Sequence, residues 1–429
     1  MSIITVLLVA LGLGLSIALH ELGHMLPAKA FKVPVPEYMI GFGPKIWSKT
    51  IGETEYGVKW VWLGGGTQIS GMYPPKPEGY VDKGPFKEII AESREESLAE
   101  IPAGQEYRAF YNIAWYKKIC VMAGGIFTNL LLAFIFFAIA FCGLGAMTPN
   151  NSIGNVTKCM AGTVCEQTMN TGADISTLTL KDGVSPAELA SLQSGDVFQS
   201  INNTKVTTFA EVQGAINDSK GKQISATVLR DGKEVTVTVS PVGVDENGAI
   251  ASNASNISRY VLGFTPGTER QYMSLAQSAE MTVQQVGLTL QIIPQLPVKL
   301  YESVASLFTG ERRGSGSLLS IIGVGQIAVE SANQADTSNL AYILLTLIGS
   351  LNVALFSFNL IPLLPLDGGH VVNALYEGAK GLIYRIRGKG KPAPSDVART
   401  LPIAIICGGL LILMMVVTVL VDIVNPVKL

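Results

Sequence analysis

The residues best suited to chemistry form a short pattern near the start of the chain, His20-Glu21-Leu22-Gly23-His24. On a helix, an H-E-x-x-H pattern places its two imidazoles on one face, one turn apart, where they can share a zinc ion. The glutamate beside them can take a proton from a zinc-bound water. Ionisable groups in an apolar helix are costly without a partner. We therefore predict that His20 and His24 bind zinc and that Glu21 is the base; the alternative is a satisfied polar cluster between helices.

A zinc ion held by two histidines needs a third protein ligand and an open position for water. The segment 359–370, NLIPLLPLDGGH, offers Asp367 in an otherwise apolar stretch. Pro362 and Pro365 break the helix there, which is tolerated at membrane depth only within protein or beside a water-filled cavity. We expect Asp367 to be the third ligand and the two glycines after it to admit another helix. We expect His370 to lie nearby without binding the metal.

The composition indicates the setting of these residues. Of the 429 residues, 48% are apolar and 15% are charged, and the mean hydropathy is +0.37. Soluble proteins carry about 25% charged residues, so an ordinary soluble enzyme and a disordered chain are both excluded. The net charge of −2 gives no sign of nucleic-acid binding.

Four apolar runs are long enough to cross about 30 Å of hydrocarbon. They lie at about residues 3–19, 119–144, 340–360 and 401–421. A signal peptide is the alternative for the first run. No basic residue precedes it, however, and the H-E-x-x-H pattern stands where a cleavage site would be, so we predict a retained helix.

The distribution of basic residues predicts the orientation of the four spans. Residues 26–118 hold 12 Lys and Arg, whereas residues 148–337 hold 12 over twice the length, and the short loop 371–400 holds six. We therefore expect both termini and residues 148–337 to face outward, away from the cytoplasm. In that oxidising compartment we expect Cys159 and Cys165 to form a disulfide; a metal pair would lack further Cys or His nearby.

Residues 155–243 are polar and contain short alternating runs that predict strands. Asp231-Gly232 between two of them predicts a hairpin. The stretch 183–202 resembles a PDZ domain of the bacterial protease type, with a short helix from Pro186 and a strand at 197–201. Such a fold can pair an extended peptide along a sheet edge; the alternative is a folded spacer that binds nothing. For residues 244–339 we expect amphipathic helices on the outer membrane surface.

The two signatures, H-E-L-G-H in the first span and N-x-x-P-x-x-P-L-D-G-G in a later one, resemble those of the site-2 protease family of intramembrane zinc metalloproteases. The segment 123–129, ending at Asn129, resembles a third element, and Leu63-Gly64-Gly65-Gly66 resembles the membrane-associated β-hairpin of that family. The resemblance is nearest to the bacterial type with four spans and a single PDZ domain, as in actinobacteria.

The resemblance implies a polytopic α-helical membrane protein with a membrane-associated β-hairpin and an inserted extracytoplasmic α+β PDZ domain. Its expected parts are 1–147 with spans one and two, 155–243 as the PDZ domain, 244–339 as interfacial helices, and 340–429 with spans three and four. It also implies a multi-pass protein of the bacterial inner (plasma) membrane, in contact with membrane lipid and not with nucleic acid.

The implied activity is zinc-dependent cleavage of single-span membrane proteins, such as anti-sigma factors, in regulated intramembrane proteolysis after a first cut by another protease. Asn359 is expected to donate a hydrogen bond to the substrate or the oxyanion; the alternative is a helix-packing amide. A segment with Tyr56–Trp62 and the glycines Gly64, Gly65 and Gly66 is expected to clamp the substrate as an added strand, and Asn129 is assigned to the same substrate site.

Two rival functions remain open at this point. An inactive metal-binding scaffold or PDZ chaperone would keep the same architecture, although the intact Glu21 argues against it. A serine intramembrane protease would have to use the Ser/Gly cluster 314–317, which lies outside the spans and has no nearby histidine.

Overall fold

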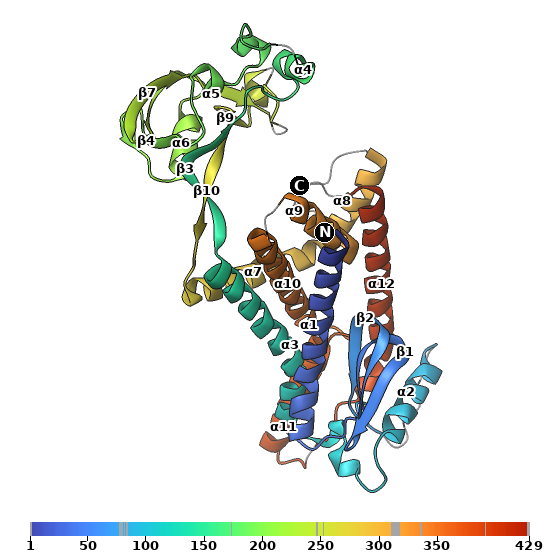
Figure 1. Ribbon diagram of the computed structural model, residues 1–429. Helices are drawn as coiled ribbons and strands as arrows, with labels where there is room; N and C mark the ends of the chain where they lie inside the picture. Colours follow the sequence, from blue (N-terminus) through green and yellow to red (C-terminus); the bar gives the residue numbers. More distant parts are fainter. Residues whose placement is uncertain are drawn as a thin grey trace. The chain divides into compact units, whose positions relative to one another are not determined.

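A computed structural model describes residues 2–76, 80, 82, 85–172, 174–245, 248–251, 253–309, 318–334, 337–390 and 392–426. The Ser/Gly cluster 314–317 lies outside the described residues. The chain divides into two compact units (Figure 1): Met1–Gly145 with Tyr272–Leu429, and Ala146–Gln271. Each unit is described by itself.

In the described part of the chain, the first unit contains four helices that are long and apolar enough to cross a membrane: Ile4–Ala30, Trp115–Leu144, Asn339–Asn359 and Val397–Val424. They correspond to α1 (Ser2–Ala30), α3 (Trp115–Ala138) with the π-helical turn Ile139–Leu144, α10 (Thr337–Asn359) and α12 (Leu401–Val424). The H-E-x-x-H segment does not interrupt α1, which continues as one helix to Ala30. The four predicted apolar runs therefore form helices.

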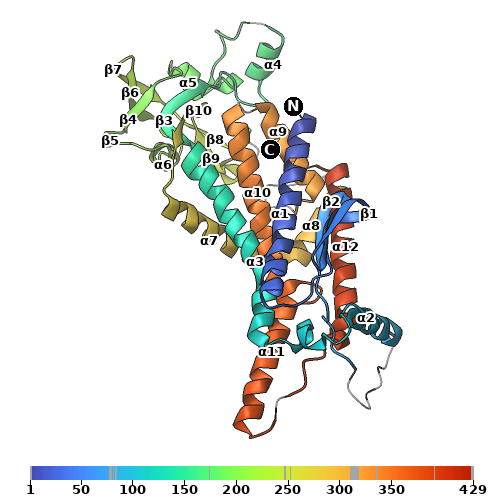
Figure 2. The ribbon, with the colours of Figure 1, turned by 60° about the horizontal axis from the view of Figure 1, so that its bottom comes forward.

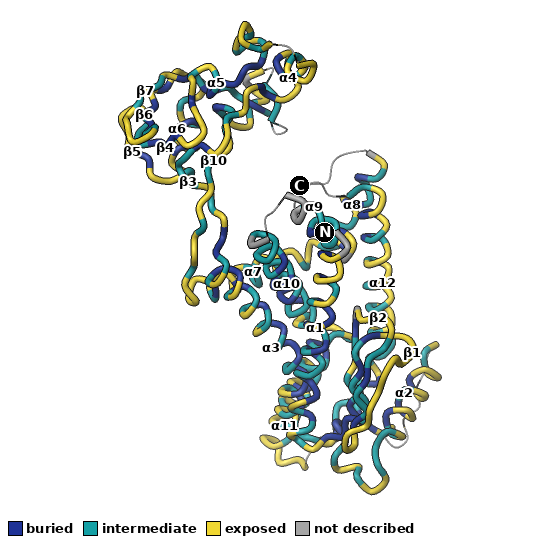
Figure 3. Tube along the Cα trace, viewed as in Figure 1, coloured by how far each residue is buried: buried dark blue, intermediate teal, exposed yellow. Residues whose placement is uncertain are grey.

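Helix α12 differs from the other three in how little protein surrounds it (Figure 3). Only 6% of its most apolar stretch is buried, against 33–39% for the others. Its exposed side chains include Ile406, Leu410 and Leu413. So large an apolar surface is not stable in water, which supports a position of α12 in hydrocarbon.

A hairpin of two long strands, β1 (Glu37–Ile51) and β2 (Thr54–Gln68), packs beside α1 (Figure 2). The strands bend, so that Tyr38 has Tyr56 as one neighbour and Thr67 as the other. Bends of this kind require unusual backbone angles, and Gly41 and Gly43 have φ of 91° and 90°.

The pairing of this hairpin corrects one sequence-based expectation. Residues 56–58 pair with 38–40 on one side and with 47–49 on the other. A strand with a neighbour on each side has no free edge to which a further strand can add. Residues 56–58, the start of the expected substrate-binding segment 56–62, therefore cannot pair with a substrate. The segment 65–68 pairs with 37–40 and is the outer strand on the side of α1. The order of the strands depends on how the bent segments contact one another. Alternation of polar and apolar residues along the sequence does not indicate these contacts.

Among the described residues, the first unit has five further α-helices: α2 (Lys87–Ala99), α7 (Leu275–Ile292), α8 (Leu296–Thr309), α9 (Ile321–Gln334) and α11 (Asp367–Ile386). Helices were expected over the whole of 244–339. The α-helices begin only at Leu275, and the segment before it holds strands and a short 3₁₀-helix, Ala254–Asn256. Alternating polar and apolar residues such as Arg259-Tyr260-Val261 suit strands better than a helix.

The second unit is built on a sheet with strand order β10-β3-β4-β6-β7, to which β5 adds beside β4. These strands are β3 (Ala146–Val156), β4 (Val197–Ile201), β5 (Thr204–Lys205), β6 (Ile224–Arg230), β7 (Lys233–Val239) and β10 (Phe264–Gln271). A separate pair consists of β8 (Val242–Val244) and β9 (Arg259–Val261). The helices are α4 (Val164–Asn170), α5 (Pro186–Leu189) and α6 (Phe209–Asp218).

The core of this unit lies between the sheet and α6, where Phe198, Val212, Ile216 and Val228 are almost fully buried. The strand expected at 197–201, the helix expected from Pro186 and the hairpin at Asp231-Gly232 are all confirmed. The unit is wider than the expected 155–243, because β3 pairs with β10 along its length from Ala146 opposite Gln271. That pairing joins segments more than 100 residues apart, which no local pattern could indicate.

Cys159 and Cys165 are joined by a disulfide in the second unit, with their Cα atoms 5.4 Å apart. We expect neither to react with an alkylating reagent in denatured, non-reduced protein. Cys120, Cys142 and Cys407 are free thiols and serve as the internal control, because they should be labelled in the same sample. Mass spectrometry of the labelled peptides measures the result; efficient labelling of both Cys159 and Cys165 would refute the bridge.

Candidate metal centre

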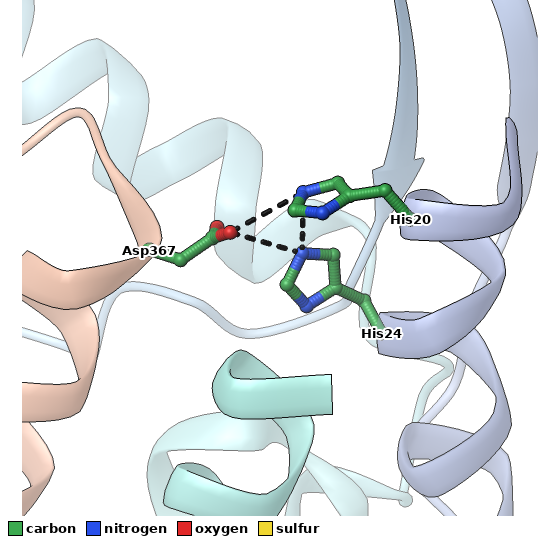
Figure 4. A group of neighbouring side chains, drawn as sticks. All are labelled: His20, His24 and Asp367. Atoms are coloured by element: carbon green, nitrogen blue, oxygen red, sulfur yellow. Dashed lines mark hydrogen bonds and ion pairs between the residues drawn. The ribbon is translucent and has the colours of Figure 1, made fainter. Parts of the chain in front are cut away.

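The two histidines of α1 and the first residue of α11 meet at one point (Figure 4). Asp367 Oδ2 lies 3.3 Å from Nε2 of His20 and 3.3 Å from Nε2 of His24, and the two Nε2 atoms are 3.2 Å apart. Both histidines are buried. Among the described residues these three form the group that could hold a metal ion. His370 is not part of this group.

The hydrogen bonds around the three side chains fit a bound cation. His24 Nδ1 lies 2.8 Å from the carbonyl oxygen of Val121, which can only accept, so Nδ1 carries the proton and Nε2 presents a lone pair. Asp367 Oδ2 is buried and receives no hydrogen bond. Zinc ligands at about 2.0–2.1 Å in a tetrahedron lie about 3.3–3.4 Å from one another. The observed separations match that value.

Asn129 of α3 lies behind His20, with its side-chain amide 3.0 Å from His20 Nδ1. Its side chain is fully buried and Oδ1 has no hydrogen-bond partner. If the side-chain amide is flipped by 180°, Oδ1 accepts a hydrogen bond from the N–H of His20 Nδ1. Nε2 of His20 then has a free lone pair for a metal ion. The expected role of Asn129 in substrate binding does not fit a residue without an exposed surface. The geometry makes it an orienting partner of a ligand.

Glu21 lies on the side of α1 that faces the hairpin. A Cβ placed on Gly65 would lie 3.4 Å from Glu21 Cγ, and the Thr67 hydroxyl donates to the Glu21 carbonyl oxygen over 2.9 Å. The outer strand of the hairpin therefore passes directly beside the expected base.

Tyr38, which the sequence analysis did not single out, holds the hairpin against α1 by donating its hydroxyl to the Ala18 carbonyl over 2.7 Å. Burial raises the pKa of Tyr38 to about 12, and the nearby Glu21 carboxylate adds to the shift. The hydroxyl therefore keeps its proton and remains a donor. Thr67 was not predicted to contact α1 either. In the sequence, Tyr38 and Thr67 stand out only as polar side chains in a largely apolar segment.

Gly64 and Gly66 lie on either side of Gly65 in β2. A Cβ on Gly64 would overlap the Phe42 ring, so only glycine fits there. A Cβ on Gly66 would meet nothing within 4 Å, so the backbone at that position is open to approach. Gly65 and Gly66 pair with Ile40 and Met39 on one side.

The loop that carries Asp367 folds against the start of α11. A Cβ on Gly368 would lie 2.4 Å from the Ile361 oxygen, and one on Gly369 would lie 2.6 Å from the Leu364 nitrogen. The two glycines were expected to admit another helix. Gly368 admits the end of α10 at Asn359 together with the loop that follows it, and Gly369 admits the loop at Leu363 and Leu364. Asn359 ends α10 and is half-buried, with its carbonyl oxygen beside Gly368.

Glycines also set the closeness of α1 and α3. A Cβ on Gly23 would lie 2.5 Å from the Gly124 oxygen. At Gly125 a Cβ would lie 2.3 Å from His24 Nε2 and 2.8 Å from His20 Cε1. The imidazoles of His20 and His24 therefore occupy the space that a side chain at position 125 would need.

Replacing Gly125 with Ala is expected to weaken zinc binding by about tenfold or more, the size of effect seen when a ligand's support is disturbed. The added methyl group must push the imidazole of His24 away from its present place. Zinc content after titration with a chelator measures the effect. Gly143→Ala, at the far end of the same span, is the control, because a Cβ there would meet nothing within 4 Å. Equal zinc retention in both variants would contradict this packing argument.

Comparison with known proteins agrees with this site. Residues 8–390 match the model of peptidase family M50. The zinc metalloprotease Rip1 of Mycobacterium tuberculosis (strain H37Rv) is 29% identical over 99% of this chain and 98% of its own length. Rip1 of Mycolicibacterium smegmatis is 27% identical with the same coverage, and the metalloprotease MmpA of Caulobacter vibrioides is 26% identical over 85% of this chain and 84% of its own. The chain thus belongs to peptidase family M50, the site-2 protease family, and is a zinc metalloprotease.

Proposed function

We propose that this zinc intramembrane protease cleaves single-span membrane proteins, such as anti-sigma factors, after another protease has made a first cut. The observation that carries the proposal is the meeting of His20 and His24, on the strongly apolar helix α1, with Asp367 at the start of α11. Glu21 lies beside a strand of glycines. A peptide bond brought to this strand comes within reach of a base and a metal site together.

The residues of the chain account for the steps of hydrolysis. His20, His24 and Asp367 would hold the zinc ion, which when bound would polarise a carbonyl group and make water more acidic. Glu21 accepts the proton of the attacking water and returns it to the leaving amine. Asn359, at the end of α10, donates a hydrogen bond to the substrate backbone or to the developing oxyanion.

The outer strand of the hairpin addresses a problem particular to membrane substrates. The peptide groups of a membrane-spanning helix are already hydrogen-bonded, and each unpaired group in lipid costs several kcal/mol. The substrate must nevertheless unwind before its scissile bond is accessible. Residues 64–67 (Gly64, Gly65, Gly66 and Thr67) offer the backbone groups of an outer strand beside Glu21, so an unwound segment can pair there as an added strand.

A trapping experiment tests the proposed substrate class. Membranes from cells with the active protein and from cells with the Glu21→Gln variant are compared by quantitative mass spectrometry. Single-span proteins with a truncated outer domain should accumulate only with the variant, and purified active protein should then cut them within the span. Accumulation of none would reject this substrate class.

The second unit is proposed to be a PDZ domain that lies, with both chain termini, on the outer side of the bacterial inner membrane. The charge distribution of the loops supports that orientation. His20, the first of the proposed zinc ligands, follows about 17 apolar residues of α1, or ~26 Å of helix. In this orientation the metal site is near the cytoplasmic face of the membrane. The unit would then act on substrate entry. A folded unit of its size has a radius of gyration of about 14 Å, enough to obstruct a substrate with a bulky outer domain.

A groove in the second unit supports recruitment as the competing role. It has a volume of about 430 Å³ and is lined by Phe209, Ile216, Leu262 and Phe264, with Arg259 at its side. An apolar groove with one cationic group suits an extended peptide that ends in a carboxylate. Recruitment and obstruction predict opposite results when the unit is removed.

Removing residues 146–271 is expected to permit cleavage of an untrimmed substrate while cleavage of a trimmed one continues. A short Gly/Ser linker can close the deletion, because Ala146 pairs with Gln271 and Met273 N donates to the Phe141 oxygen over 3.1 Å. Cleavage of both substrates by full-length and shortened protein is compared at equal zinc content. If the shortened protein binds zinc but cuts neither substrate, the unit recruits and does not obstruct.

A further inference from the structure

Two polar side chains that the mechanism does not use meet at membrane depth. Ser16 of α1 and Asn352 of α10 are 1% and 0% exposed. Asn352 Nδ2 donates to Ser16 Oγ over 2.8 Å and to the Ile348 oxygen over 2.9 Å. Ser16 Oγ in turn donates to the Gly12 oxygen over 2.8 Å. The bond between the two side chains links two membrane helices.

This bond lies close to both parts of the metal site. Ser16 precedes His20 by one helical turn, so the two share a face of α1. Asn352 lies two turns before Asn359, where α10 ends. From there the loop to Asp367 is a series of hydrogen-bonded turns, with Leu360 N on the Phe356 oxygen and Leu366 N on the Leu363 oxygen. A shift of α10 is therefore passed along the loop toward the Asp367 carboxylate.

The neighbouring packing admits little adjustment. A Cβ on Gly12 would lie 2.4 Å from Ile348 Cδ1, so the two helices are already in close contact one turn from the hydrogen bond. Apolar contacts alone do not select one register in hydrocarbon, since lipid is as apolar as the side chains; a hydrogen bond between helices does select one.

We propose that the bond between Ser16 and Asn352 is a positioning contact that sets the register of α1 against α10 and so holds His20 and His24 within reach of Asp367. The inference rests on the metal site proposed above. A slip of α1 by one residue moves its side chains about 1.5 Å along the axis. Metal–ligand distances tolerate only about 0.2 Å, so even a fraction of that slip weakens the site.

The test uses the purified full-length protein with Asn352→Leu, with Ser16→Ala and with both changes. Chelator titration measures zinc affinity, and the visible spectrum of the cobalt-loaded protein reports the coordination geometry without any substrate. Each single change is expected to weaken zinc binding by about 10- to 100-fold and to alter the cobalt spectrum. The double variant should be no weaker than the worse single variant, because both remove the same bond. Ser16→Thr keeps a hydroxyl and should restore binding.

Thr346→Val is the matched control. It removes a hydroxyl hydrogen bond within the same helix, from Thr346 Oγ1 to the Tyr342 oxygen at 3.0 Å, and should leave zinc affinity unchanged. If Asn352→Leu does not fold, Ser16→Ala and its Ser16→Thr partner decide the question alone. Unchanged affinity and spectrum in the single variants, additive losses in the double variant, or an equal loss in Thr346→Val would each overturn the positioning role. None of these readouts depends on proteolysis, so the proposed substrate can fail without affecting this result.

Discussion

Replacing Glu21 with Gln is expected to abolish most cleavage while zinc stays bound and the fold stays intact. The glutamine amide is nearly the same size as the carboxylate but cannot accept a proton from water. A general base contributes about 10²- to 10⁴-fold to the rate of such a reaction. Glu21 is not one of the three residues that meet at the metal site, so its loss leaves the ligands in place. Cleavage rate and zinc content, measured on the same preparation, give both results.

A matched substitution separates the loss of the base from a general loss of charge. Glu92 is exposed on α2, and Glu92→Gln removes one carboxylate without touching the site. This control should cleave at the rate of the unmodified protein. Near-normal cleavage by the Glu21 variant would mean that another group removes the proton.

The sequence was sufficient to single out the three residues that meet in the structure, because their surroundings made them conspicuous. Histidine is rare in the chain, and His20 and His24 stand at helical spacing in a run that is otherwise apolar. Asp367 stands out in the same way between prolines and glycines. Charge in an apolar helix is costly, so composition alone indicates that these residues have a function.

The partners of those ligands could not be predicted in the same way. Asn129 is a common type of residue, and its place behind His20 depends on how closely α3 packs on α1. The bond from Ser16 to Asn352 joins residues 336 positions apart. A single sequence contains no record of which distant residues meet, so such contacts become visible only once the helices are packed.

The hairpin and the second unit show the same limit for strands. Alternation indicated the strands on either side of Asp231-Gly232, and the resemblance to a PDZ domain indicated the strand at 197–201. These are local features. Alternation does not indicate which strands become neighbours in a sheet. It therefore gave neither the pairing of β3 with β10 nor the position of 65–68 as the outer strand. For that reason the strands were predicted more reliably than the edge on which the substrate is proposed to bind.

Replacing Asp367 with Ala is expected to remove most of the bound zinc, whereas replacing His370 with Ala should leave it. The argument is geometric, since Asp367 Oδ2 lies 3.3 Å from both Nε2 atoms and His370 is outside the group that could hold a metal. Two histidines alone leave zinc with one protein ligand fewer than catalytic sites use. Metal analysis of the two purified variants after identical dialysis measures the difference.

Both substitutions lie in the first turn of α11, so the pair controls for local damage to that helix. Asp367→Asn adds a third arm, because it keeps the size of the side chain and removes its charge. It should retain less zinc than His370→Ala and no less than Asp367→Ala, since a neutral amide oxygen is a weaker ligand for a divalent cation than a carboxylate. Full zinc occupancy in Asp367→Ala would rule out this ligand. Loss of zinc in His370→Ala to the same extent would show that α11 itself, and not the carboxylate, determines metal binding.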